Sequence, residues 1–136
     1  EFAEASRFQD ALAKYGNAWE LLPEPKKQWE AATWLLAAIG DANFLKGDFE
    51  SGRQNFALAM HCPNAIGNPF LHLRLGQCSL EFNDEDVAAD ELTRAYMAEG
   101  HQIFENDDPK YFAFLKTKLD PPADGWPDER KKWKFW

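Results

Sequence analysis

Residues 34–63 contain two apolar helical stripes separated by a short polar turn, and this pattern constrains the fold more than any other. Apolar residues recur at helical spacing over 35–45 and again over 49–60. Between the stripes, Gly47 can adopt the positive φ that ends a helix, and Asp48 can cap the next one. The segment therefore predicts a helical hairpin. Such a hairpin needs a neighbour of the same kind to bury both of its apolar faces.

The same pattern recurs 36 residues further along the chain. The matching residues are Gly40, Asp48, Phe56 and Ala59 in the first copy and Gly76, Asp84, Leu92 and Ala95 in the second. Upstream, the second half of the unit is reproduced by Ala11, Tyr15, Ala18 and Pro23. Recurrence at this period is typical of proteins built from stacked helical hairpins.

The units resemble the tetratricopeptide repeat, a helix-turn-helix of 34 residues. That family places Leu-Gly late in its first helix, which corresponds here to Ile39-Gly40 and Leu75-Gly76. In the second helix it places a small residue, a large residue and then Ala, which are Gly52, Phe56 and Ala59 here, and then Ala88, Leu92 and Ala95. The chain departs from the family at Asn43 and Ser79, where an aromatic residue is usual, and in its longer period. The resemblance covers residues 8–105 and implies an all-α fold, a short right-handed α-solenoid of degenerate TPR-like hairpins.

The sequence predicts helices at residues 3–22, 26–46, 49–60, 69–82, 85–99 and 110–119. Gly16 lowers helix stability, so it predicts a close helix contact. The last helix is a C-terminal capping helix, because a solenoid otherwise exposes an apolar face at its end. We expect a single helical domain over 1–119 and an irregular Pro/Trp-rich tail over 120–136, with Trp126 against the body. For the basic, aromatic end of this tail, contact with the acidic segment, contact with a partner, disorder and a vector origin all stay open.

The net charge of −8 is concentrated in one part of the chain. Residues 81–108 hold ten acidic residues against one basic residue, Arg94. A field of this sign repels nucleic acid and favours a basic partner, although a solvated helix face is the alternative interpretation. No apolar run approaches the roughly 20 residues that cross a membrane, and no secretory signal is visible, so we expect a cytoplasmic protein.

The sequence contains no motif that predicts a catalytic, cofactor or metal site. Cys62 and Cys78 match no metal spacing, and we expect free thiols. His72 lies in an apolar helix, where a hydrogen-bonded packing residue is expected in preference to a ligand. Binding is therefore the default interpretation. An enzyme would need carboxylates or His72 in a cleft with strongly shifted pKa values.

In the tetratricopeptide family, the first helix of each unit lines a concave groove that accepts a peptide or protein. Alignment on the glycines places Trp34, Asp41 and Phe44 in this groove from one unit, and Phe70, Gln77 and Glu81 from the next. Aromatic anchors beside polar groups are typical of binding hot spots. The alternative for Trp34 and Phe44 is a place in the core. A second candidate contact face for a basic partner consists of Asp84, Glu85 and Asp86.

The segments 67–76, 88–96 and 108–115 also resemble small bacterial repeat proteins that accompany secreted polymorphic toxins and act as immunity proteins, over residues 65–118. This resemblance implies a non-enzymatic antitoxin that binds a toxin domain directly, with its acidic groups suited to a basic toxin. The alternative is a chaperone or scaffold of the same repeat type that holds a peptide segment in its groove. We expect no cofactor, metal, nucleic acid or membrane partner, and the oligomeric state stays open.

Overall fold

The computed structural model describes the backbone of residues 2–129 and the side chains of residues 6–129. Within this part the chain forms six α-helices and three short 3-10 helices, and it contains no strand. The α-helices are α1 (Phe2–Leu21), α2 (Glu30–Leu45), α3 (Phe49–Ala59), α4 (Pro69–Glu81), α5 (Glu85–Glu99) and α6 (Pro109–Lys116). The 3-10 helices are η1 (Lys26–Gln28), η2 (His101–Phe104) and η3 (Pro127–Glu129). The all-α prediction is confirmed, while the basic end of the tail, 130–136, lies outside the described residues.

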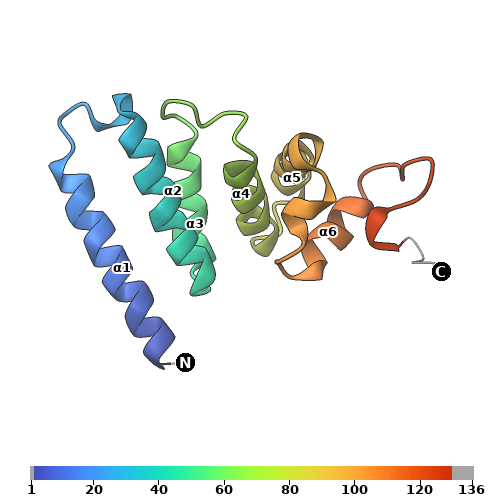
Figure 1. Cartoon of the computed structure of the whole chain (residues 1–136), viewed down its shortest axis with the longest axis horizontal. Coiled ribbons are helices and arrows are strands. Elements are labelled where there is room, and N and C mark those ends of the chain that lie inside the picture. Colours follow the sequence, from blue (N-terminus) through green and yellow to red (C-terminus); the bar gives the residue numbers. More distant parts are fainter. Residues whose placement is uncertain (1, 130–136) are drawn as a thin grey trace, which may run out of the picture.

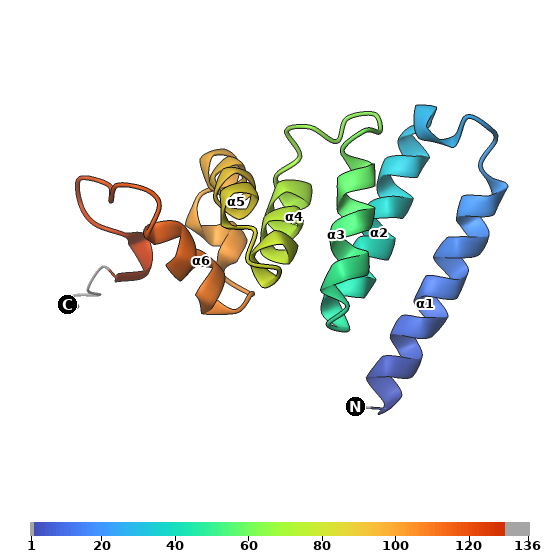
Figure 2. The ribbon, with the colours of Figure 1, turned by 180° about the vertical axis from the view of Figure 1, so that it is seen from behind.

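The helices follow one another along the long axis of the molecule in the order of the sequence (Figures 1 and 2). α1 stands at one end, and α6 with the tail stands at the other. α2 packs against α3 and α4 packs against α5, so each forms a hairpin with the helix that follows it. The α3–α4 contact joins the hairpins, and α1 packs against α2. This is the sequential stacking of pairs that a solenoid requires.

Two glycines allow the helices within each hairpin to cross closely. A Cβ atom on Gly40 would lie 2.9 Å from the Phe56 ring, and one on Gly76 would lie 2.7 Å from Cγ of Leu92. Both members of the second pair lie 36 residues after those of the first. Phe56 and Leu92 are completely buried. The repeated contact confirms the predicted alignment of the two hairpins.

The two hairpin turns are also equivalent. Gly47 and Asn83, 36 residues apart, both have positive φ, at 89° and 59°. Asparagine is one of the few residues other than glycine that adopt this conformation readily. The next residue, Asp48 or Asp84, then caps the second helix by accepting a hydrogen bond from the backbone N–H three residues on. Local sequence therefore explains where each hairpin turns.

The interior consists of two hydrophobic clusters, and Phe44 packs against both of them. The first cluster lies mainly among α2, α3 and α4, and its close α3–α4 contact depends on Gly52, where a Cβ would lie 3.2 Å from Sγ of Cys78. The second lies among α4, α5, η2 and α6. It includes Trp126, which is buried with its ring centroid 5.8 Å from that of Phe112. The predicted contact between the tail and the body is confirmed.

Three local predictions were wrong. A Cβ on Gly16 would meet nothing within 4 Å, so this glycine marks no close helix contact. The helix predicted over 26–46 is divided between η1 and α2, because Trp29 is extended (φ −101°, ψ 138°) and its indole N–H donates to the Pro23 carbonyl. The helix predicted over 110–119 ends at Lys116. The hydroxyl of the next residue, Thr117, donates a hydrogen bond to the carbonyl of Phe114 in the last turn.

Candidate protein-binding site

A pocket of about 270 Å³ opens between the first helices of the two hairpins. Its lining residues are Thr33, Trp34, Ala37, Asn68, Phe70 and Leu71. Trp34 is 62% exposed and Phe70 is 37% exposed, so both rings offer surface to a partner. The structure thus brings together two of the predicted groove residues. It also excludes the alternative that Trp34 belongs to the core.

The walls of this pocket are held in place by hydrogen bonds from its two polar lining residues. The side-chain oxygen of Asn68 accepts bonds from the backbone N–H groups of Phe70 and Leu71, at 3.0 and 3.3 Å, and so fixes the start of α4. The Thr33 hydroxyl donates to the carbonyl of Pro63 at 2.7 Å, which ties the α3–α4 loop to α2. The pocket is therefore formed before any partner arrives.

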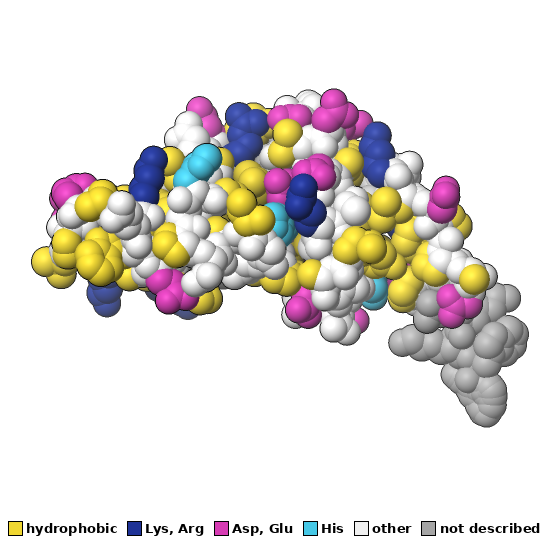
Figure 3. Space-filling model, turned by 90° about the horizontal axis from the view of Figure 1, so that it is seen from above, with side chains coloured by type: hydrophobic (Ala, Val, Ile, Leu, Met, Phe, Trp, Pro, Cys, Tyr) yellow, Lys and Arg dark blue, Asp and Glu magenta, His cyan; other side chains and the backbone are white. Residues whose placement is uncertain are grey.

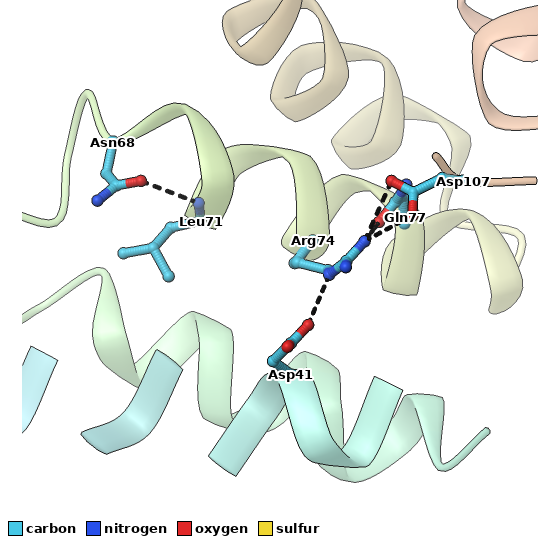
Figure 4. Close-up of polar contacts among 6 residues, drawn as sticks. All are labelled: Asp41, Asn68, Leu71, Arg74, Gln77 and Asp107. Carbon is cyan, nitrogen blue, oxygen red and sulfur yellow. Dashed lines mark hydrogen bonds and ion pairs between the residues drawn. The ribbon is translucent and has the colours of Figure 1, made fainter. Parts of the chain in front are cut away.

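Arg74, one turn beyond Phe70 on α4, bridges to Asp41, two turns beyond Trp34 on α2 (Figure 4). Its Nε donates to Oδ1 of Asp41 at 2.9 Å. The guanidinium lies 4.3 Å from the ring centroid of Phe44 and 5.1 Å from that of Phe70. The exposed fraction of Arg74 is only 9%. This buried cation links α4 of the second hairpin to α2 of the first.

The same arginine also binds the loop that precedes α6. Its Nη1 donates to Asp107 at 3.2 Å and to the amide oxygen of Gln77 at 2.8 Å. Gln77 in turn donates from Nε2 to Asp107 at 3.0 Å. Gln77 is completely buried, because Asp107 closes over this part of α4 (Figure 4). A partner reaches Gln77, a predicted groove residue, only if this loop moves.

Glu81, another predicted groove residue, is bound within the chain. Its Oε2 accepts a hydrogen bond from the Tyr111 hydroxyl at 2.6 Å and lies 2.7 Å from Nζ of Lys110. Burial raises the pKa of the Glu81 carboxyl, but the hydrogen bonds from Lys110 and Tyr111 outweigh burial and hold that pKa below its usual range. Glu81 thus connects α4 to α6, and the groove is closed at this end.

The other two predicted groove residues lie between these extremes. Phe44 is half-buried and packs against both hydrophobic clusters, so it combines the core and groove interpretations. The Asp41 side chain is 31% exposed and uses only Oδ1 in its bond to Arg74. Asp41 is therefore partly accessible to a partner, and it lines a separate pocket between α1 and α2.

The acidic segment is not a single free patch. Asp84 caps α5, and Oε1 of Glu85 lies 3.5 Å from Nζ of Lys118. The side chain of Asp86 is exposed and has no ion pair or hydrogen bond to another described residue. Most other acidic residues of this segment also bind groups of the chain, namely Asp90, Glu91, Glu105, Asp107 and Asp108. From above, charged and hydrophobic side chains are interspersed over the surface (Figure 3). Much of the negative charge is therefore already bound by groups of the chain itself.

His72 is a packing residue, as predicted. It is buried, and its Nε2 accepts a hydrogen bond from the backbone N–H of Gly67 at 2.9 Å. Its Nδ1 lies 2.5 Å from Oε1 of Glu91. Since Nε2 accepts a hydrogen bond, the ring N–H is at Nδ1, and it donates a hydrogen bond to Oε1 of Glu91. Across residues 6–129, no group of three or more His, Cys, Asp or Glu side chains is placed to hold a metal ion.

Both cysteines are free and buried, which confirms the prediction of free thiols. Burial raises the pKa of Cys62, and it raises the pKa of Cys78 to about 12. A thiol of such high pKa is almost entirely protonated at neutral pH and is a poor nucleophile. Cys78 therefore serves as a small core residue against Gly52.

Sequence reasoning missed the two residues that organise this site, Arg74 and Asp107. Arg74 gave a usable signal, because it is the one basic residue of 54–93 and stands among apolar residues of a helix. Asp107 gave none, since it is one of ten acidic residues in its segment. Contact between them depends on the tertiary fold.

No helix in the described part of the chain combines the length and apolar character needed to cross a bilayer. Comparison of the chain with protein-family models, with curated proteins and with solved structures gave no match.

Proposed function

We propose that this chain is a protein-binding module that performs no reaction of its own, and that it is a cytoplasmic immunity protein against a bacterial toxin domain. The observation that carries the proposal is the preformed pocket between Trp34 and Phe70. Exposed aromatic rings on rigid, hydrogen-bonded supports are the usual core of a binding hot spot. The resemblance of residues 65–118 to immunity proteins, and of the hairpins to tetratricopeptide repeats, supports the more specific part.

The pocket is a better candidate for the contact surface than the acidic turn before α5. Trp34 and Phe70 contribute large exposed rings, whereas Asp84 and Glu85 already bind groups of the chain. The remaining negative charge still favours a basic toxin, because complementary charge accelerates association. In this proposal the pocket provides affinity and the overall charge provides attraction at long range.

The experiment is co-expression in a bacterial host with the toxic domain encoded by the neighbouring reading frame, followed by calorimetry on the purified pair. We expect restored growth and a complex with a nanomolar Kd. Trp34→Ala should weaken binding by about 2 kcal/mol, about 30-fold, because truncation of a hot-spot aromatic has this effect. The matched control is Leu58→Ala, which alters an exposed apolar residue of α3 and should leave the Kd unchanged.

Absence of both protection and complex formation would contradict the immunity function. The second candidate function, a chaperone or scaffold that holds a peptide segment, is favoured by the same pocket, since it lies between first helices. It predicts binding to an unfolded segment of a client and no binding to a folded toxin domain. Titration of both forms against the wild-type chain separates the two functions.

A further inference from the structure

We infer that the pocket between Trp34 and Phe70 takes an apolar side chain of the partner, and that Asp41 binds a lysine or arginine of the same partner segment. This inference rests on the proposed protein-binding function. Beyond that function, it specifies which two residue types the bound segment contains and how far apart they are in its sequence.

The pocket selects an apolar side chain because most of its lining is apolar and the side-chain oxygens of its two polar lining residues are already hydrogen-bonded. The Thr33 hydroxyl donates to Pro63, and the side-chain oxygen of Asn68 caps α4. What remains facing the pocket is mainly the surface of Trp34, Phe70 and aliphatic neighbours. A cavity of about 150 Å³ is enough for benzene, so about 270 Å³ accommodates a leucine or phenylalanine side chain.

The charge on α2 two turns beyond Trp34 selects a cation. Arg74 is bound by two carboxylates, Asp41 and Asp107, so the three side chains together carry one negative charge. The Asp41 side chain is 31% exposed, and its Oδ2 accepts no hydrogen bond from residues 6–129. A basic side chain gains an ion pair with this oxygen, whereas an acidic side chain meets a net negative site.

The helix geometry sets the spacing of the two contacts. Trp34 and Asp41 are both on α2, two turns apart, which corresponds to about 10 Å at a rise of 1.5 Å per residue. An extended segment advances about 3.3 Å per residue. The basic residue therefore belongs about three positions from the apolar anchor, in whichever direction the segment runs.

The probes are fluorescein-labelled eight-residue peptides with a serine-glycine background and one phenylalanine anchor. The third position on one side of the anchor is Lys, Arg, Gln or Glu, and a second set reverses the direction. Fluorescence anisotropy with the full chain should show at least tenfold tighter binding of the Lys and Arg peptides than of the Glu peptide. Replacement of the anchor by serine should abolish binding.

Two variants assign the contacts. Trp34→Ala should weaken binding of every anchored peptide by tenfold or more. Asp41→Asn should bring the Lys and Glu peptides to within about threefold of each other, while Asn still accepts the bond from Arg74. The control is Asp90→Asn, a carboxylate of α5 that is also paired with an arginine, Arg94, and it should leave the discrimination intact.

The inference is overturned if the Glu peptide binds as tightly as the Lys peptide, if Asp41→Asn keeps the discrimination, or if no anchored peptide binds below 1 mM. Any of these outcomes, together with retained neutralisation of the toxin domain, leaves the proposed function standing. Loss of neutralisation by the wild-type chain removes the proposed function itself. The two failures are therefore distinguishable.

Discussion

The α2–α3 and α4–α5 hairpins both have a glycine where their two helices cross. They differ on the side of the first helix that faces away from the second helix of the same hairpin. In α2, Trp34 is exposed and Ala38 lines a surface pocket. The positions 36 residues later in α4 hold Phe70 and Arg74, and Arg74 is buried beneath Phe44, Phe70 and the loop before α6. One hairpin keeps this side open, and the other is tied to the elements on both sides of it.

The difference shows that the residues repeated between the two hairpins and the residues that differ lie on separate sides of the first helix. Positions 40 and 76 face the second helix of their hairpin, where close contact admits only a very small residue. Positions 38 and 74 lie away from that crossing, so one can be alanine and the other an arginine that links three units. Three sets of substitutions test this distinction.

The largest effect is expected from Arg74→Met, which removes the link and leaves Asp107 and Asp41 without their cation. Loss of one member of a buried ion network costs about 3 kcal/mol or more, because the remaining charge is not compensated. Urea denaturation should show this decrease in the free energy of unfolding. Ala38→Met, at the equivalent position of the open hairpin, should change stability by less than about 0.5 kcal/mol. Equal effects at both positions would contradict the comparison.

Glycine-to-alanine substitutions should lower stability at the helix crossings and not elsewhere in the stack. Gly76→Ala places a methyl group 2.7 Å from Leu92 Cγ and 3.1 Å from its backbone N, so we expect a loss of about 2 kcal/mol by overpacking. Gly40→Ala meets only ring atoms of Phe56, which can shift, and should cost less. Gly16→Ala meets nothing and should gain about 0.5–1 kcal/mol from helix propensity. Thermal unfolding measures all three, and a destabilised Gly16→Ala protein would show that α1 is packed differently.

The smallest effects are expected at the two helix caps. Asp48→Ala should cost about 1 kcal/mol and Asp84→Ala somewhat less, because its capping bond is longer, at 3.4 Å against 3.1 Å. Hydrogen bonds from the side chain and backbone of Ser51 lower the pKa of Asp48. Its cap therefore stabilises the protein fully above the unfolded pKa of about 3.9 and is lost as pH falls through the lower folded value.

Unfolding curves of wild type and Asp48→Ala at about pH 7 and about pH 2 test this sign. The difference in stability should be present at neutral pH and vanish in acid. A difference that is equal at both pH values would mean that the Asp48 carboxylate makes no charge-dependent contribution.

Features that depend on local spacing were predictable from the sequence. The glycine crossings, the turn at Gly47 and the Asp48 and Asp84 caps follow from residues close to one another in a repeated pattern. The break at Trp29 was not predictable, because it depends on where the indole finds its acceptor, Pro23. Local pattern alone cannot report such a contact.

The candidate site was predictable in outline only. Alignment placed Trp34 and Phe70 on the correct helices, but α2 is apolar on nearly all sides, so its sequence did not distinguish a groove from a core. The burial of Gln77 was hidden because its cover, Asp107, lies 30 residues away among many equivalent carboxylates. Long-range polar contacts therefore decided which predicted residues a partner can reach.

Arg74 stands midway in the chain between its two acidic partners, with 33 residues on either side. In a stack held only by contacts between neighbouring units, an end unit can fray while the others stay folded. A side chain that binds the units before and after its own makes their opening interdependent, since release of one partner weakens the hold on the other. We therefore expect the units from α2 to the loop before α6 to melt in one cooperative step.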